Sequence, residues 1–158
     1  VVYDPTRDEM FAAERGGGAY LNQRKIKVSR VKELKESLVS TGFPSARRHL
    51  NINIHFYYQL AMITHGVRRA GAAAIDLAYV ACGRSDAFWE FNLKPWDMAA
   101  GTLLVEEAGG RVSDMRGGPY HLKVPEVVAD NGAVHEELIS LFGEVFRGTF
   151  RHTLPELA

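Results

Sequence analysis

Two carboxylates stand close together in the sequence, where a strand-like segment gives way to a helix-like one. Glu90 ends the apolar run 86–90, and Asp97 opens the mostly apolar segment 97–108. In an open α/β sheet, polar ligands bind at the carboxyl ends of the strands, where the chain turns into the next helix. The spacing therefore predicts that Glu90 and Asp97 face one ligand site.

Each acid also has an ordinary structural interpretation. Asp97 stands where a helix N-cap is expected, so its carboxylate could accept amide hydrogen bonds from the first turn instead of binding a metal ion. Glu90 could be a solvated acid at the end of a strand. The residues behind Asp97 are the small Ala99, Ala100 and Gly101, which let a ligand or another backbone approach closely. They favour a site.

A second candidate contact is the sequence Gly-Ala-Ala-Ala at 71–74, which opens another helix. Amides at a helix N-terminus attract anions, and small side chains leave room for a phosphate ester. Gly71, Ala72 and Ala73 are therefore candidate substrate contacts. Asp76 lies inside the apolar helix that follows, and we expect a core hydrogen bond to hold it, in preference to a catalytic role.

Composition and charge argue against several classes of protein. Lys plus Arg and Asp plus Glu number 19 each, so the charge balance gives no reason to expect nucleic acid as a partner. No apolar run is long enough to span a bilayer, and the start is not signal-like. The single cysteine, Cys82, cannot form an internal disulfide, and we expect a cytoplasmic protein. The six histidines lack zinc-site spacing, and no serine-hydrolase elbow is present.

The hydrophobic pattern divides the chain into β hairpins (1–33), an α/β region (34–146) and a tail (147–158). Strands are predicted at 1–3, 9–13, 19–21, 25–28, 37–41, 67–69, 86–90, 111–113 and 127–130, and helices at 51–65, 72–82, 97–108 and 135–146. Strands separated by helices of this length predict a mostly parallel, helix-covered sheet. The tail has no clear periodicity and is expected to fray.

The order of several motifs resembles the inositol monophosphatase family of magnesium-dependent phosphomonoesterases. The resemblance runs from Val1 to about Phe142. It is most specific at Trp-Asp-Met-Ala-Ala-Gly (96–101) with Glu-Ala-Gly-Gly (107–110). Supporting matches are Val-Val-Tyr-Asp-Pro (1–5), Phe-Ala-Ala-Glu-Arg-Gly (11–16), Gly-Ala-Tyr-Leu-Asn (18–22), Thr-Gly-Phe-Pro (41–44) and Arg-Ala-Gly-Ala-Ala (69–73).

This resemblance implies the layered α-β-α-β-α phosphatase fold, Mg²⁺ as cofactor and a homodimer for the full-length enzyme. It implies that Asp97 is a metal ligand, that Glu90 hydrogen-bonds substrate hydroxyls, and that the helix start at 71–73 lies along the substrate. The family often has Ser or Thr at the position of Ala72, so a hydroxyl contact is missing here. It also favours Asn-Gly in the second hairpin, where this chain has Asn22-Gln23.

The family's Asp-Pro-Ile/Leu-Asp-Gly-Thr motif and its paired glutamates are absent, and in the family they precede the position of Val1. The resemblance therefore implies a C-terminal fragment that keeps one metal ligand and is inactive alone. The leading interpretation is Mg²⁺-dependent hydrolysis of a sugar or inositol monophosphate. The alternatives are fructose bisphosphate, histidinol phosphate or a nucleotide 3′-phosphate as substrate, and a non-catalytic binding or assembly module.

Overall fold

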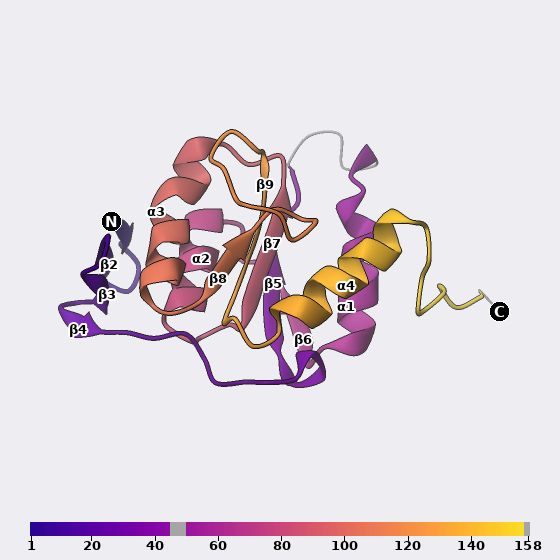
Figure 1. Cartoon of the computed structure of the whole chain (residues 1–158), viewed down its shortest axis with the longest axis horizontal. Coiled ribbons are helices and arrows are strands. Elements are labelled where there is room, and N and C mark those ends of the chain that lie inside the picture. Colours follow the sequence, from indigo (N-terminus) through magenta and orange to yellow (C-terminus); the bar gives the residue numbers. More distant parts are fainter. Residues whose placement is uncertain (45–49, 157–158) are drawn as a thin grey trace.

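The chain folds into alternating layers of strands and helices (Figure 1). The computed structural model describes residues 1–44 and 50–156, so His49 and the last two residues of the predicted tail lie outside it. A small sheet lies at the end that holds the N-terminus, followed by helices α2 and α3, a five-stranded sheet, and helices α1 and α4 (Figure 1). This order gives four consecutive layers of the fold that the sequence implies.

The first sheet is a meander of antiparallel strands. Its order is β1 (Val2–Asp4), β2 (Glu9–Glu14), β3 (Gly18–Leu21) and β4 (Arg24–Lys25). The turn between β3 and β4 holds Asn22 at φ 43° and Gln23 at φ 68°. Two consecutive positive φ angles are what a tight hairpin turn demands, and glycine adopts the second one most easily. Gln23 therefore takes the left-handed conformation where the family favours Gly.

The second sheet is mixed, and this differs in part from the mostly parallel sheet that the sequence predicts. Its strands, in the order β6-β5-β7-β9-β8, are β6 (Gly66–Arg68), β5 (Leu38–Thr41), β7 (Ala87–Phe91), β9 (Glu126–Asp130) and β8 (Arg111–Ser113). The β5–β6 and β5–β7 ladders are parallel, whereas β9 runs antiparallel to both of its neighbours. No helix separates β8 from β9, so an antiparallel pair can form through a loop.

In the described part of the chain, four α-helices cover the second sheet on its two faces, and their bounds lie within a few residues of those predicted. They are α1 (Asn53–Ile63), α2 (Ala73–Ala81), α3 (Pro95–Glu107) and α4 (His135–Phe146). On β7, Phe88 is buried in the core with α2 and α3, whereas Trp89 is buried in the core with α1 and α4. Because side chains alternate along a strand, Glu90 shares the face of Phe88, under α2 and α3.

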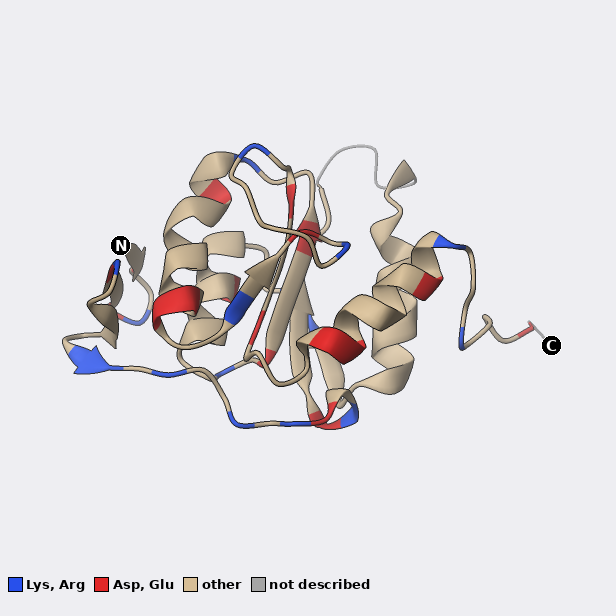
Figure 2. Cartoon of the chain, in the orientation of Figure 1, with Lys and Arg blue, Asp and Glu red and all other residues tan. Residues whose placement is uncertain are grey.

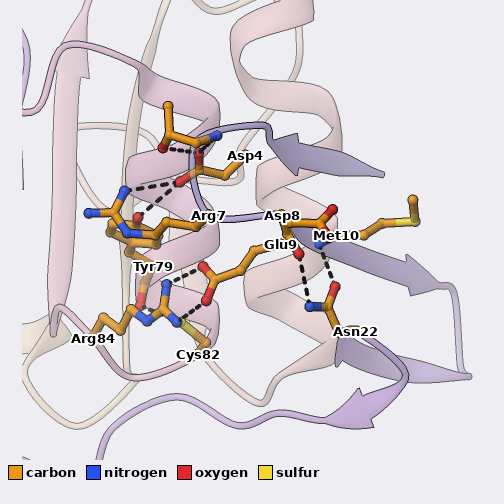
Figure 3. Close-up of polar contacts among 10 residues, drawn as sticks. Asp4, Arg7, Asp8, Glu9, Met10, Asn22, Tyr79, Cys82 and Arg84 are labelled. Carbon is orange, nitrogen blue, oxygen red and sulfur yellow. Dashed lines mark hydrogen bonds and ion pairs between the residues drawn. The ribbon is translucent and has the colours of Figure 1, made fainter.

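Polar contacts fasten the small sheet to α2 (Figure 3). The Tyr79 hydroxyl donates to Asp4 Oδ2 at 3.3 Å. Arg84, just beyond α2, donates from both terminal nitrogens to Glu9, each at 2.6 Å, and stacks over the Tyr79 ring. On α3, the Glu107 carboxylate accepts the backbone N–H groups of Gly16 and Gly18 at 2.7 and 2.9 Å. The loop between β2 and β3, which contains Gly16 and Gly18, thus ties the small sheet to α3.

The connection from β4 to β5 runs along the lower edge of the molecule in Figure 2, from the small sheet to the five-stranded sheet. Lys and Arg recur along it (Figure 2). It is fastened at a few points. Leu34, in a single 3-10 turn (Leu34–Glu36), is fully buried. The Asn131 side-chain amide donates to the carbonyl oxygen of Val31 at 2.8 Å. The basic side chains are therefore a solvated face of an anchored segment.

Two residues of the C-terminal segment, His152 and Thr153, are hydrogen-bonded to side chains of α1, although the sequence of the tail predicts fraying. The Gln59 side chain donates to the carbonyl of His152 at 2.7 Å and accepts its N–H at 3.0 Å. Tyr58 donates to the carbonyl of Thr153 at 2.8 Å, and Leu154 lines the groove between the segment and α1. The side-chain amide of Gln59 thus pairs with the backbone of one residue, much as a neighbouring strand would. This contact leaves no periodic pattern in the sequence of the tail.

Close packing between α2 and α3 depends on Gly101. A Cβ at this position would lie 2.5 Å from the Leu77 Cβ. We expect Gly101→Ala to lower the free energy of unfolding by about 1–3 kcal/mol through overpacking, measured by urea denaturation. The control is Gly143→Ala on α4, where a Cβ meets only the flexible Arg147 guanidinium at 3.3 Å. Equal effects of the two substitutions would contradict the packing argument.

None of the helices within residues 1–44 and 50–156 has the length and apolar character needed to cross a membrane.

Candidate active site

A cleft of about 260 Å³ opens where β5 and β7 end and where α2 and α3 begin. The structure brings all the sequence-predicted site residues to this cleft. It is lined by Gly42, Phe43, Arg69, Gly71, Ala72, Ala73, Glu90, Asn92, Leu93 and Asp97. Residues from four separate elements thus converge at the carboxyl edge of two parallel strands, which is where α/β sheets bind ligands.

Glu90 lies half-buried in the cleft, near the end of β7. Burial raises the pKa of its carboxyl group to about 7, and the charges of Asp76 and Asp97 add to the effect, while Arg69 lowers the pKa. Glu90 therefore changes its charge near neutral pH. A carboxyl group in this state can both donate to and accept from hydroxyl groups.

Gly42, the residue after β5, makes room for this carboxyl group. A Cβ built on Gly42 would lie only 2.1 Å from Glu90 Oε2. The parallel register pairs Thr41 with Trp89, which places the next residue on each strand, Gly42 and Glu90, side by side. Glycine at this position is therefore required by close approach and not by backbone conformation, because Gly42 does not adopt a positive φ.

Asp97 lies in the first turn of α3 and is not its N-cap, so the N-cap interpretation is wrong. The helix begins at Pro95, with Lys94 as N-cap, because proline suits the first helical position. Asp97 Oδ2 accepts the backbone N–H of Lys94 at 2.8 Å. The carboxylate thus reaches back to the residue before the helix, as in a capping box, and the same side chain lines the cleft.

The start of α2 forms another wall of the cleft. Gly71 adopts φ 96°, which bends the chain into the helix. The N-cap is Ala72, whose side chain makes no capping hydrogen bond. A helix N-terminus of this kind carries partial positive charge that favours an anion.

Sequence reasoning did not select five lining residues as site residues: Gly42, Phe43, Arg69, Asn92 and Leu93. Two signals were present, because Thr-Gly-Phe-Pro (41–44) ends a strand and Arg69 stands two residues before the Gly-Ala-Ala sequence that leads into α2. Asn92 carries the signal of a turn, and it adopts φ 63° between β7 and α3. Arg69 is the only cation among the described lining residues and donates weakly to the carbonyl of Phe43, at 3.4 Å.

Asp76 meets the expectation of a core hydrogen bond in part. It is only 3% exposed, and its Oδ2 has no hydrogen-bond partner among the described residues. Burial raises the pKa of this carboxyl group to about 7. The helix carries Asp76 into the interior next to β5, where hydrogen bonds from the Ser40 side chain and the Ala72 backbone to its carboxyl group lower the pKa and oppose part of the effect of burial.

The donor set of the cleft fits a magnesium ion only in part. Within residues 1–44 and 50–156, no group of three His, Cys, Asp or Glu side chains is placed to hold a metal ion. Magnesium often takes one or two protein carboxylates, with water and substrate phosphate completing its shell. Asp97 can supply one such oxygen, since only its Oδ2 accepts a hydrogen bond from the described residues.

The raised pKa of Glu90 predicts a pH-dependent cost in stability. Below about pH 4.5, its usual pKa, both the folded and the unfolded chain hold the proton. Between about pH 4.5 and 7 the unfolded chain releases it first, so the free energy of unfolding falls as pH rises. Above pH 7 the carboxyl group is ionised in both the folded and the unfolded chain, and the free energy of unfolding is lowered by the full amount.

We therefore expect Glu90→Gln to raise the melting temperature at pH 8 relative to the parent, with a smaller gain or none at pH 4.5. Taking the difference in melting temperature between variant and parent at each pH removes the contributions of the other titrating groups. Glu106→Gln, at an exposed position of α3, is the matched control. A Glu90→Gln difference that stays constant across this pH range would show that the group titrates normally.

Comparisons with known proteins identify the family. A sequence profile of the inositol monophosphatase family matches residues 1–146. The chain belongs to the inositol monophosphatase family. The structure of inositol monophosphatase from Anabaena superposes with a TM-score of 0.84 at 45% identity, over 87% of this chain and 55% of that one. The fold expected from the resemblance is therefore confirmed.

Curated relatives within the family carry two different names. The chain is 50% identical over 143 residues to Nus factor SuhB of Pseudomonas aeruginosa, covering 89% of this chain and 53% of the relative. It is 48% identical over 139 residues to inositol-1-monophosphatase of Synechocystis, covering 87% and 48%. The chain thus spans about half the length of the curated relatives that it matches.

Proposed function

We propose that this inositol monophosphatase homologue supplies the substrate-binding side of a magnesium-dependent phosphatase acting on a sugar or inositol monophosphate. The observation that carries the proposal is one cleft in which Glu90, Asp97 and the start of α2 meet. The cleft combines an acceptor for hydroxyl groups, an oxygen ligand for a cation and a helix N-terminus for an anion. A phosphorylated polyol offers groups complementary to all three.

In this proposal each wall of the cleft has a separate task. The Glu90 carboxyl group hydrogen-bonds two neighbouring hydroxyls of the polyol and fixes its orientation. Gly71, Ala72 and Ala73 let the ring lie close to the α2 backbone, and Asp97 donates one oxygen to the metal. When bound, Mg²⁺ supplies positive charge that stabilises the phosphoryl oxygens.

The test uses a chimera in which this chain replaces the matching half of the Synechocystis inositol-1-monophosphatase. We expect the chimera to release phosphate from inositol 1-phosphate in a Mg²⁺-dependent manner. We expect the 158-residue chain alone to be nearly inactive, because its described residues hold no three-ligand metal cluster. A chain that alone turns over about once per second, an ordinary enzyme rate, would overturn this part of the proposal.

Glu90→Gln in the chimera tests the substrate contact. Gln keeps the shape of Glu but turns one acceptor into a donor, so the rate on inositol 1-phosphate should fall about tenfold or more. The rate on p-nitrophenyl phosphate, which has no polyol hydroxyls, and the Mg²⁺ requirement should change little. Equal losses on the two substrates would assign Glu90 to metal support or to strand-end structure.

A non-catalytic assembly module is the second candidate. It is favoured by the 50% identity to a relative that is named as a Nus factor. A chimera that folds and binds Mg²⁺ but releases no phosphate from any of the candidate substrates would favour this function over hydrolysis.

A further inference from the structure

The candidate active site contains an aromatic ring to which the proposed function gives no task. Phe43 follows β5 and lines the cleft together with Glu90 and Asp97. Its side chain is half-buried, so part of the ring borders the open cleft. Leu93, which follows β7, is the other large apolar residue of the lining. Apolar side chains in a ligand cleft bind apolar surface of the ligand, so these two residues indicate a ligand with an apolar face.

Contacts from two directions hold Phe43 in place. Its ring packs edge-on against Tyr57 of α1, with 5.7 Å between the ring centroids and an interplanar angle of 65°. This edge-to-face arrangement is a favoured geometry of aromatic pairs. The backbone carbonyl of Phe43 accepts a weak hydrogen bond from Arg69, at 3.4 Å. The ring is therefore a fixed wall of the cleft, and a preorganised surface loses little entropy when a ligand binds.

Phe43 and Glu90 border the cleft from opposite faces of the five-stranded sheet. Tyr57, which contacts the Phe43 ring, belongs to α1 on one face. Glu90 shares the other face with Phe88, under α2 and α3. β5 and β7 are neighbours in the sheet, and neighbouring strands lie about 4.8 Å apart. A small ring that lies across this edge of the sheet can thus contact both the aromatic ring and the carboxyl group.

These two contacts differ in chemistry, and together they select the shape of the substrate. A carboxyl group hydrogen-bonds hydroxyl groups, which project from the rim of a cyclic polyol. The C–H groups make the faces of such a ring less polar than its rim, and an aromatic ring packs against them through dispersion and burial of apolar surface. An open-chain polyol has no such face, because its hydroxyl groups point in several directions along a flexible chain.

We propose that Phe43 is a specificity-determining residue that packs against the C–H face of a cyclic polyol phosphate. Leu93 extends this apolar wall, and Glu90 binds hydroxyl groups at the rim of the same ring. The inference rests on the proposed function and deepens it, since it narrows the substrate class to phosphates of ring-shaped polyols. The contact needs neither the metal nor Asp97, so it can be measured without turnover.

Two substrates with the same number of free hydroxyl groups test the proposal in the chimera. Inositol 1-phosphate is cyclic, whereas sorbitol 6-phosphate is an open chain. Phe43→Leu keeps an apolar side chain but removes the flat ring. We expect KM for inositol 1-phosphate to rise about fivefold or more, because an aromatic contact is lost. The kcat value and the KM for sorbitol 6-phosphate should change little, since the contact is made equally in the ground state and the transition state.

Matched variants separate this contact from simple packing. Phe43→Tyr keeps the ring and should retain the parent's preference for inositol 1-phosphate. Phe150→Leu makes the same change on the C-terminal segment, outside the lining of the cleft, and should leave both KM values unchanged. The melting temperature of each variant is measured on the same preparation. Equal rises in KM on the two substrates, or a rise that merely follows unfolding, would assign Phe43 to packing on α1 and overturn the proposal.

A binding measurement separates this inference from the phosphatase function. In Mg²⁺-free buffer, we expect transferred nuclear Overhauser effects between the Phe43 ring and the C–H protons of inositol 1-phosphate on the chimera, and their loss in Phe43→Leu. A chimera that shows these effects but releases no phosphate with Mg²⁺ would contradict the proposed function and support this inference. Hydrolysis of inositol 1-phosphate without the contact, or no binding of this ester, would overturn the inference.

Discussion

Replacement of Asp97 by Asn should remove nearly all phosphatase activity from the chimera while leaving the fold intact. Asn keeps an oxygen that can accept the Lys94 amide, at present 2.8 Å from the carboxylate. It removes the negative charge that we assign to the metal. Stabilisation of a phosphoryl group by a bound cation is worth several kcal/mol, so we expect a fall in kcat/KM of about a hundredfold or more.

Activity and melting temperature measured on the same preparation decide this prediction. The Mg²⁺ concentration for half-maximal activity should rise in the variant, and the melting temperature should stay near that of the parent chimera. Glu106→Gln, on the same helix but exposed and outside the lining of the cleft, serves as the control. Activity restored in full by a modest increase in Mg²⁺, or an activity loss that merely follows unfolding, would make Asp97 a structural residue.

Gly42→Ala should be the second large effect, and it should act through Glu90. The added Cβ would lie 2.1 Å from the Glu90 carboxyl group, so this group must leave the cleft. Because the displaced atoms are the end of a flexible side chain, we expect little change in stability but about a tenfold or greater loss of activity on inositol 1-phosphate.

A double-mutant cycle separates this mechanism from general damage. In a Glu90→Ala background the methyl group has no carboxyl group to displace, so Gly42→Ala should cost little further activity. Gly143→Ala, on α4 and outside the lining of the cleft, controls for the loss of a glycine. Additive losses for Gly42→Ala and Glu90→Ala would show that Gly42 matters for another reason, such as the path of the chain after β5.

The sequence by itself determined most of the secondary structure, because local patterns encode it. The apolar run of β7 and the helical spacing along α1 and α4 are visible in the order of apolar residues. The strand-to-helix turn also predicted that Glu90 and Asp97 would meet. Parallel neighbours place their carboxyl ends at one edge, so a short spacing in sequence became a shared cleft in the structure.

Contacts between distant segments were decided only by the tertiary structure. The direction of β9 follows from its insertion between β7 and β8, and the docking of the tail follows from the amide of Gln59. Neither feature leaves a periodic signal. The close approach of Gly42 to Glu90 and the lack of a hydrogen-bond partner at Asp76 Oδ2 also leave no signal in the sequence. Both features depend on how far these residues lie from atoms of other elements. The packing of α2, β5 and β7 against one another sets these distances.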